Sequence, residues 1–337
     1  MNRSVIRWIL VALMALSLVL TLSCPYIAYA EGTLPLDYLE GGKAPKDEGW
    51  TFDENGYPLS YQDSTIEVTF EHEAFEHTLT AGQNKGSKAK NDEWWVVRIK
   101  IRDVSQLRTA VAKNDYMKKS FAPAESMAAE KNAVVAMNGD FFKYENDVGY
   151  LVRQGELIRD ATDNSHGQIF DMLLIDSAGN FHVVYAAVTE TIDEYVAENL
   201  TPYGLTVLDT FNIGPVLVLN GEAQDVSQAT MVHMRSSYQW DSSIERIAIV
   251  QTGELEYAIV TVGTRTKTSG LSMQEFADFI AEKCPDAILA YNLDGGGSAN
   301  LTGTMQKKNG TLQHVRLNRN NDIRDITDIL YFASAED

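Results

Sequence analysis

A short run of polar and small residues after an apolar segment is the strongest candidate for chemistry in this sequence. Residues 292–300 read NLDGGGSAN, so three glycines separate Asp294 from Ser298. Glycines in series cost backbone entropy, which indicates that backbone N–H groups approach a ligand such as a phosphate. Asp294, at a strand end, would then be a reactive carboxylate. The alternative is a tight turn whose Asp and Asn cap backbone groups. The expected ligand-binding residues of this run are Asn292, Gly295, Gly296, Gly297 and Ser298.

The run matches no common nucleotide-binding or hydrolase motif. It lacks the G-K-[S/T] ending of a P-loop, and Ser298 is not followed by the final glycine of G-x-S-x-G. A phosphate-binding P-loop and a serine nucleophile elbow are therefore excluded at this position.

A second segment ends in the same way. Residues 133–140 read AVVAMNGD and residues 287–294 read AILAYNLD, and an Ala-Glu-Lys precedes each of them. Four of the eight positions are identical, and Asn292 follows Asn138 by 154 residues. We interpret this as a duplicated half-domain, in which two strands bring Asn-x-Asp ends to a shared cleft. Asp140 then joins Asp294 as a candidate. The alternative is that any two helix–strand units rich in Ala and Val can look alike.

Three arginines are candidates for binding an anion. Arg246 begins an apolar strand, Arg265 lies in a polar loop, and Arg324 precedes the last strand. An arginine beside a glycine-rich turn can bind phosphate through two parallel hydrogen bonds. The alternative for each is a surface ion pair of little consequence.

No cofactor is certain from the sequence. No Cys/His set has the spacing of a zinc site. Residues 159–167 (RDATDNSHG) offer oxygen ligands but fit no EF-hand pattern, so a divalent cation, Ca²⁺ or Mg²⁺, stays open.

The elements that must position these residues are mostly strands. Alternating or buried apolar runs predict strands at 65–70, 94–101, 133–137, 172–176, 181–185, 216–219, 244–251, 257–262, 287–291 and 326–332. Helices are expected at 124–131 and from Ser272, where Ser-Met-Gln-Glu has the form of a capping box. Strands interrupted by a few helices predict an α+β fold with mixed, mainly antiparallel sheets, built from two pseudo-symmetric halves.

The N-terminus is typical of export. Arg3 and Arg7 precede a charge-free run of 23 residues, 8–30, which contains Pro25 and ends in Ala-Tyr-Ala. We predict a signal peptide at 1–30, a linker or N-terminal arm at 31–63, and one domain at 64–337. An uncleaved membrane anchor and a lipoprotein site at Cys24 are the alternatives. All three place the protein outside the cytoplasm, in the extracellular space or the cell envelope.

The acidic charge limits the partners. The chain has 28 Lys and Arg against 47 Asp and Glu, a net charge of −19. Such a field repels nucleic acid and anionic lipid, so we expect no nucleic-acid partner and membrane contact only through an uncleaved N-terminus. Cys284 is expected to be a packed residue, because Cys24 would leave with the signal peptide and no disulfide would remain.

Taken together, these segments resemble the phosphodiester glycosidase family over about residues 94–332. The similar segments are NLDGGGS at 292–298, NGDFF at 138–142, GPVLV at 214–218 with Asn-Gly at 220–221, RIAI at 246–249, and the closing strand at 324–332. Three positions depart from the family pattern. Asp140 and Val250 each stand where the family has Gly, and Gly263 stands where the family has Asp, two residues before Arg265.

The resemblance implies an exported glycosidase that hydrolyses a sugar-1-phosphodiester, of the GlcNAc-1-phosphate type, in a cell-envelope glycan or polymer. Asp294 would activate water or support the anomeric centre, and Asn138 with Asn292 would bind sugar hydroxyls or orient Asp294. Arg246 and Arg324, with the glycine-run N–H groups, would stabilise phosphate charge. The alternative, suggested by the missing carboxylate near Arg265, is a non-catalytic module that binds envelope glycan.

Overall fold

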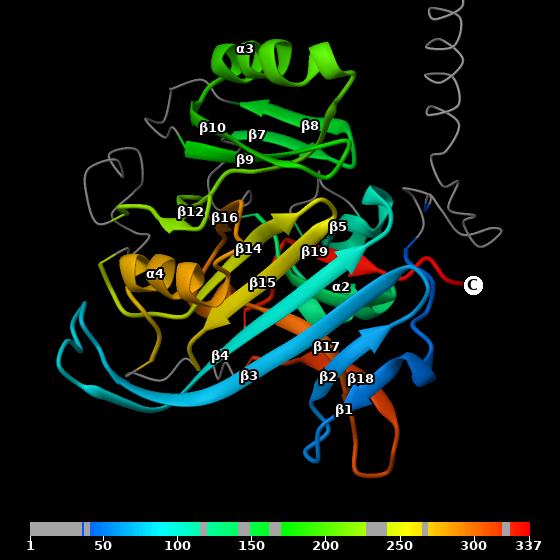
Figure 1. The fold of residues 1–337 in the computed structure, drawn as a ribbon, viewed down its shortest axis with the longest axis vertical. Coiled ribbons are helices and arrows are strands. Elements are labelled where there is room, and N and C mark those ends of the chain that lie inside the picture. The colour runs from blue at the N-terminus through cyan, green and yellow to red at the C-terminus, as the bar shows by residue number, and fades with distance from the viewer. Residues whose placement is uncertain are drawn as a thin grey trace, which may run out of the picture. The chain divides into compact units, whose positions relative to one another are not determined.

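The structure is a computed structural model that describes residues 36, 41–114, 120–140, 149–161, 170–226, 241–264, 269–318 and 324–337. Within these residues the strands form four sheets of nine, five, three and two strands, and every strand pairing is antiparallel (Figure 1). Three α-helices accompany them. The predicted α+β fold with mainly antiparallel sheets is therefore confirmed, while the pseudo-symmetry of two halves stays a prediction.

The nine-stranded sheet has the order β1 (Trp50–Phe52), β2 (Pro58–Gln62), β3 (Ile66–Thr78), β4 (Lys88–Ile101), β15 (Glu256–Val262), β14 (Arg246–Gly253), β16 (Leu289–Asn292), β12 (Val216–Leu219) and β13 (Glu222–Ala223). The five-stranded sheet has the order β18 (Leu312–Arg316), β17 (Leu301–Gln306), β6 (Ala133–Asn138), β19 (Asp328–Ala333) and β5 (Leu107–Val111).

The two smaller sheets consist of β10 (Phe181–Ala187), β9 (Phe170–Asp176) and β11 (Val207–Phe211), and of β7 (Gly149–Arg153) with β8 (Glu156–Ala161). The helices are α2 (Ala124–Glu130), α3 (Thr189–Asn199) and α4 (Met273–Lys283). Short 3-10 turns are η1 (Asp47–Gly49), η2 (Val104–Gln106), η3 (Ala112–Asn114), η6 (Thr201–Tyr203) and η9 (Gly296–Ser298).

The nine-stranded sheet is buried on both faces at its centre. In β4, Trp95 and Val97 point into the main hydrophobic core, and their neighbours Trp94 and Val96 point into a second core on the other face. Side chains of the five-stranded and three-stranded sheets also enter the main core. Helix α4 covers the second core (Figure 1) with Met273, Phe276, Ala277 and Ile280. A two-sided burial of this kind explains why the central strands read as nearly continuous apolar runs.

Helix α4 begins at the predicted capping box. The backbone N–H of Glu275 donates to Ser272 Oγ (3.4 Å), and Glu275 Oε2 accepts from the backbone N–H of Ser272 (2.9 Å). The helix ends at Lys283, and Cys284 after it is fully buried among apolar side chains. This confirms both the helix start and the packed cysteine.

Part of the segment that we expected to be a linker or arm belongs to the main sheet. Within the predicted 31–63 arm, residues 50–52 form β1 and residues 58–62 form β2, and β2 pairs with β3. Their aromatic side chains Trp50 and Tyr61 are buried in the main core, so the segment contributes apolar contacts that its polar composition hides. The predicted signal peptide lies outside the described residues. None of the helices described is long and apolar enough to cross a membrane.

Candidate functional site

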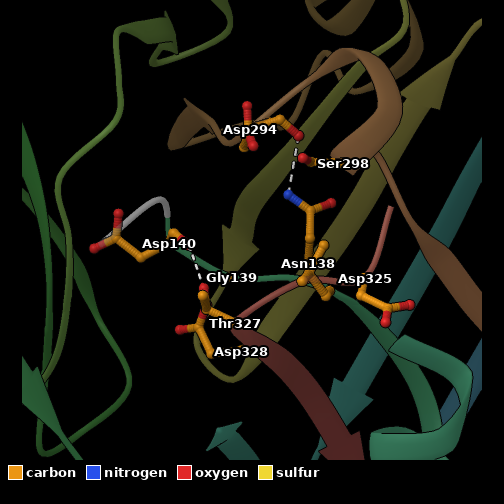
Figure 2. A pocket seen from close by; sticks show the side chains of 9 residues that line it. Asn138, Gly139, Asp140, Asp294, Ser298, Asp325, Thr327 and Asp328 are labelled. Atoms are coloured by element: carbon orange, nitrogen blue, oxygen red, sulfur yellow. Dashed lines mark hydrogen bonds between the residues drawn. The ribbon is translucent and has the colours of Figure 1, made fainter. Parts of the chain in front are cut away.

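A small pocket, partly open to solvent, lies where β6 ends and β19 begins (Figure 2). It is lined by Asn138, Gly139, Asp140, Asp294, Ser298, Asp325, Ile326, Thr327 and Asp328. Four of these are aspartates, and none of these nine is a lysine or an arginine. A pocket of this kind offers carboxylates as bases or as partners of a developing positive charge.

The sheet pairing brings three distant segments to this pocket. In the five-stranded sheet Asn138 at the end of β6 pairs with Ile329 of β19, so that Asp328 follows next to Gly139. The Gly139 N–H donates to the backbone oxygen of Asp328 (2.9 Å). β16 ends at Asn292 in the nine-stranded sheet and delivers Asp294 to the same place. The pocket thus forms where ends of the two large sheets meet.

Asn138 connects the two Asn-x-Asp segments directly. Its Nδ2 donates to the backbone oxygen of Asp294 (2.9 Å), as Figure 2 shows, and its Oδ1 accepts from the backbone N–H of Asn300 (3.0 Å). Both polar ends of the amide are therefore used within the protein. Asn138 is thus hydrogen-bonded to the segment that carries Asp294, and its role in orienting that carboxylate stays a prediction.

Asp294 is a carboxylate that can exchange a proton near neutral pH. Burial raises its pKa to about 6, and the charge of Asp140 acts in the same direction. The Ser298 hydroxyl, the Gly295 N–H and the charge of Arg324 favour the ionised form and limit the shift. A group with this pKa is suited to accept a proton from water at neutral pH.

The glycine run shapes the turn that holds Asp294. A Cβ at Gly295 would lie 2.6 Å from the backbone oxygen of Glu245, and Gly296 has a φ of +57°. The Gly296 N–H donates to Glu245 O (2.9 Å), and the N–H groups of Ser298 and Ala299 donate back into the 3-10 turn η9. These three N–H groups hold the turn itself. The run therefore supplies fewer donors for a phosphate than its three glycines suggest.

Comparison with known proteins places the chain in a family. The model of a family described as phosphodiester glycosidase matches residues 131–333, which include every residue of the pocket. The chain belongs to the phosphodiester glycosidase family. The predicted family is thereby confirmed, and membership supports a glycosidase-like, hydrolytic function.

A solved structure supports the fold of this phosphodiester glycosidase family member. It is similar to the zebrafish N-acetylglucosamine-1-phosphodiester alpha-N-acetylglucosaminidase catalytic domain, which is auto-inhibited by its pro-peptide. The TM-score is 0.56 with 17% identity over 80% of this chain and 88% of that chain. A hypothetical protein from Synechocystis gives a TM-score of 0.47 with 17% identity, over 79% of this chain and 62% of that chain. No curated protein matches the sequence significantly.

Asp140 lies at the pocket beside two residues that the sequence did not single out, Arg153 and Asp328. Asp140 Oδ2 accepts from the backbone N–H and the Nδ2 of Asn212 (both 3.2 Å), and it lies 3.7 Å from Arg153 Nη2. Arg153 Nη2 also donates to Asp328 Oδ2 (2.9 Å). Burial and the charge of Asp140 raise the pKa of Asp328 to about 7. Arg153 and Asp328 were missed because an isolated charge at a strand end carries no signal in one sequence.

The predicted arginines occupy different places. Arg246 is buried and does not line the pocket: its Nε donates to Leu271 O (3.1 Å) and its Nη2 to Ser242 O (2.9 Å). Burial lowers its pKa to about 10. Arg324 is exposed beside the pocket, with its N–H donating to Gly297 O (3.3 Å). Arg265 lies outside the described residues.

Asn292 is not among the described residues that line the pocket. Asn292 Nδ2 donates to the backbone oxygen of Gly214 (2.8 Å), next to the cis peptide bond between Gly214 and Pro215, so it braces that loop. Most of the loop at 159–167 lies outside the described residues. Among all the residues that the structure describes, no group of three or more His, Cys, Asp or Glu is placed to hold a metal ion.

Proposed function

We propose that the protein is an exported hydrolase that cleaves the bond between the anomeric carbon of a sugar and a phosphodiester oxygen. The substrate is of the GlcNAc-1-phosphate type and belongs to a glycan or polymer of the cell envelope. Family membership supports the reaction class. The observation that carries the proposal is the position of Asp294. It lies in a pocket between two sheets, with a pKa near neutrality and a hydrogen-bonded turn holding it.

Asp294 accepts the proton of the attacking water in this mechanism. Water adds to the anomeric carbon, the bond from that carbon to the phosphate oxygen breaks, and the electron pair leaves with the phosphate. The leaving group is a phosphomonoester, whose second pKa of about 6 means that it needs little help from an acid. One carboxylate as base therefore suffices.

The charges around the pocket suggest how the substrate lies. Positive charge develops on the sugar as the bond breaks, and the aspartates of the pocket stabilise it. Arg324 is the predicted phosphate-binding arginine that the structure places beside the pocket, so the phosphate lies on its side, at the rim. The sugar ring then lies over the mouth of the pocket, facing its carboxylates.

Export through the N-terminal segment fits an envelope substrate, and it stays part of the proposal. Arg3, Arg7 and the apolar run after them are the features that support it.

Turnover of p-nitrophenyl GlcNAc-1-phosphate and of UDP-GlcNAc by the purified protein, with and without EDTA, tests the function. We expect release of GlcNAc from at least one of them, a loss of about 100-fold or more in kcat for Asp294→Asn, and an unchanged rate for the control Asp286→Asn. Asp286 is an exposed aspartate near the end of α4. Full activity of a folded Asp294→Asn protein would contradict the role of Asp294.

The second candidate is a binding module for anionic envelope glycan on the same fold. Two observations favour it: Gly263 replaces a family aspartate, and three N–H groups of the glycine turn are used inside the protein. Saturable binding to isolated cell wall without any turnover of the two substrates would establish this alternative.

A further inference from the structure

A buried arginine lies next to the pocket and binds two of the residues that line it. Arg153 ends β7, and its side chain is only 1% exposed. Its Nη2 is 2.9 Å from Asp328 Oδ2 and 3.7 Å from Asp140 Oδ2. The two aspartates come from different strands of the five-stranded sheet, since Asp140 follows β6 and Asp328 begins β19. One guanidinium therefore ties both carboxylates together.

The rest of the Arg153 side chain is fixed from other directions. Nη1 donates to the backbone oxygens of Val152 (2.9 Å) and Thr210, and Cζ lies 4.5 Å from the centre of the Phe211 ring. Asp140 is also held by Asn212, which follows β11. The cation thus has a single orientation, set by β7 and β11. Through its contacts with Asp140 and Asp328, the guanidinium also fixes these two side chains of the pocket wall.

The space around the pair is tight. A Cβ at Gly139 would lie 2.5 to 2.7 Å from the three atoms of the Asp328 carboxyl group. Any residue other than glycine at this position would therefore displace that carboxyl group. A buried ion pair is seldom needed for stability, because well-packed apolar residues of the same volume do as well. Since two acidic partners of this arginine, Asp140 and Asp328, line one pocket, a role in the pocket is the better explanation.

We propose that Arg153 is a positioning residue of the catalytic site, which fixes the Asp140 and Asp328 carboxylates so that the pocket wall presents a set negative charge to the anomeric carbon. The inference rests on the proposed function, because positive charge develops at that carbon while the carbon–oxygen bond breaks and its electron pair leaves with the phosphate. Arg153 itself does not touch the substrate and acts through the two carboxylates.

The arrangement should depend on pH. The charged groups that face Asp328 are Arg153 from β7 and Asp140 after β6, and Asp209 of β11 also interacts with the charge of Arg153. Below a pH of about 7, Asp328 carries a proton, and of these two carboxyl groups only that of Asp140 forms an ion pair with Arg153. Above it, the two carboxylates share one cation. Asp328→Asn imitates the protonated form at every pH.

Four variants of the full chain separate positioning from stability: Arg153→Met, Arg153→Lys, Asp328→Asn and the double variant Arg153→Met/Asp328→Asn. kcat and KM are measured on p-nitrophenyl GlcNAc-1-phosphate between pH 5 and 9, and kcat is corrected for the folded fraction. We expect Arg153→Met to lose about 100-fold in kcat, the cost of a misplacement near 1 Å, with KM within a few-fold of the natural value. Arg153→Lys should recover part of the loss.

The double variant is the decisive one. It removes one cation and one carboxylate together, so the net charge of the buried cluster equals that of the natural protein and its urea midpoint should return toward the natural value, while its kcat should stay as low as in Arg153→Met. Asp328→Asn alone should lower kcat above pH 7 to the value seen below it, because it removes one of the two carboxylates of the wall, and the change in rate near pH 7 should disappear. Arg98→Met, which removes a half-exposed arginine from an ion pair with Asp286 at 3.5 Å, is the matched control and should keep the natural kcat.

Two results would overturn the inference. Recovery of kcat to the level of Asp328→Asn, together with recovery of stability, in the double variant would show that Arg153 only supports the fold. An unchanged kcat in folded Arg153→Met would show that the wall needs no such cation. Absence of turnover by the natural protein is a different result, because it contradicts the proposed function itself. In that case the catalytic meaning of Arg153 falls with it.

Discussion

The buried Asp328 carboxyl should make the protein less stable as the pH rises from 4 to 7. Its pKa is raised from the ordinary 3.8 to about 7, first by burial and then by the charge of Asp140. The folded state therefore binds this proton more tightly than the unfolded state does. The stabilisation is fully present below about pH 4 and is lost as the pH rises through about 7.

The size follows from the shift of the pKa. Each unit of difference between the folded and unfolded pKa corresponds to about 1.4 kcal/mol, so a shift of about 3 units gives about 4 kcal/mol in total. Between pH 5 and pH 8, where the protein can be studied in urea, the share of this group is about 3 kcal/mol. The Asp328→Asn variant lacks this pH-dependent contribution to the free energy of unfolding.

Urea unfolding of the natural protein and of Asp328→Asn at pH 5, 6, 7 and 8, followed by circular dichroism, measures the effect. The free energy of unfolding of the natural protein should fall relative to that of Asp328→Asn by about 3 kcal/mol from pH 5 to pH 8. Asp47→Asn, which alters an exposed aspartate in η1, is the control and should run parallel to the natural protein. Parallel curves for Asp328→Asn as well would refute the argument that burial holds a proton on this group.

Three further predictions concern other parts of the structure. Gly139→Ala should lower the free energy of unfolding by about 1–3 kcal/mol and displace Asp328, because its Cβ would lie 2.5 Å from that carboxyl group. Gly310→Ala, which meets no atom within 4 Å but has a φ of +83°, should cost only about 1 kcal/mol, so equal costs in urea unfolding would contradict the steric reasoning. Ser272→Ala should lower the free energy of unfolding by about 1 kcal/mol through loss of the α4 cap, and no change in the urea midpoint would show that the cap is dispensable. Cys284 should react with Ellman's reagent only after unfolding, because it is fully buried and its pKa is raised to about 11; rapid labelling of the native protein would disprove this.

The fold class and the two Asn-x-Asp segments could be predicted because local sequence carries them. Buried strands appear in the sequence as apolar runs, and the capping box at Ser272 predicts the start of a helix. The similarity of residues 133–140 and 287–294 led to the expectation of a shared cleft, and Asp140 and Asp294 do line one pocket. Each of these features depends on residues that are close together in the chain.

The rest depends on contacts between distant segments. Whether Arg246 points to the pocket is decided by the face of β14 on which it lies, and the structure turns it toward Leu271 and Ser242. Asn292 resembles Asn138 in sequence, but its neighbour is the loop at Gly214. The pairing of Arg153 with Asp328 joins residues 175 positions apart. No pattern in a single sequence reports such a pairing.

The most direct test of the central claim asks which bond is broken. Hydrolysis of p-nitrophenyl GlcNAc-1-phosphate by the purified protein in water enriched in oxygen-18 leaves the label on one of the two products, and mass spectrometry locates it. Attack at the anomeric carbon predicts the label at C1 of the released GlcNAc and none in the phosphomonoester. Label in the phosphate would mean that the phosphorus–oxygen bond is cleaved. That result would contradict the proposal that the protein cleaves the bond between the anomeric carbon and the phosphate oxygen.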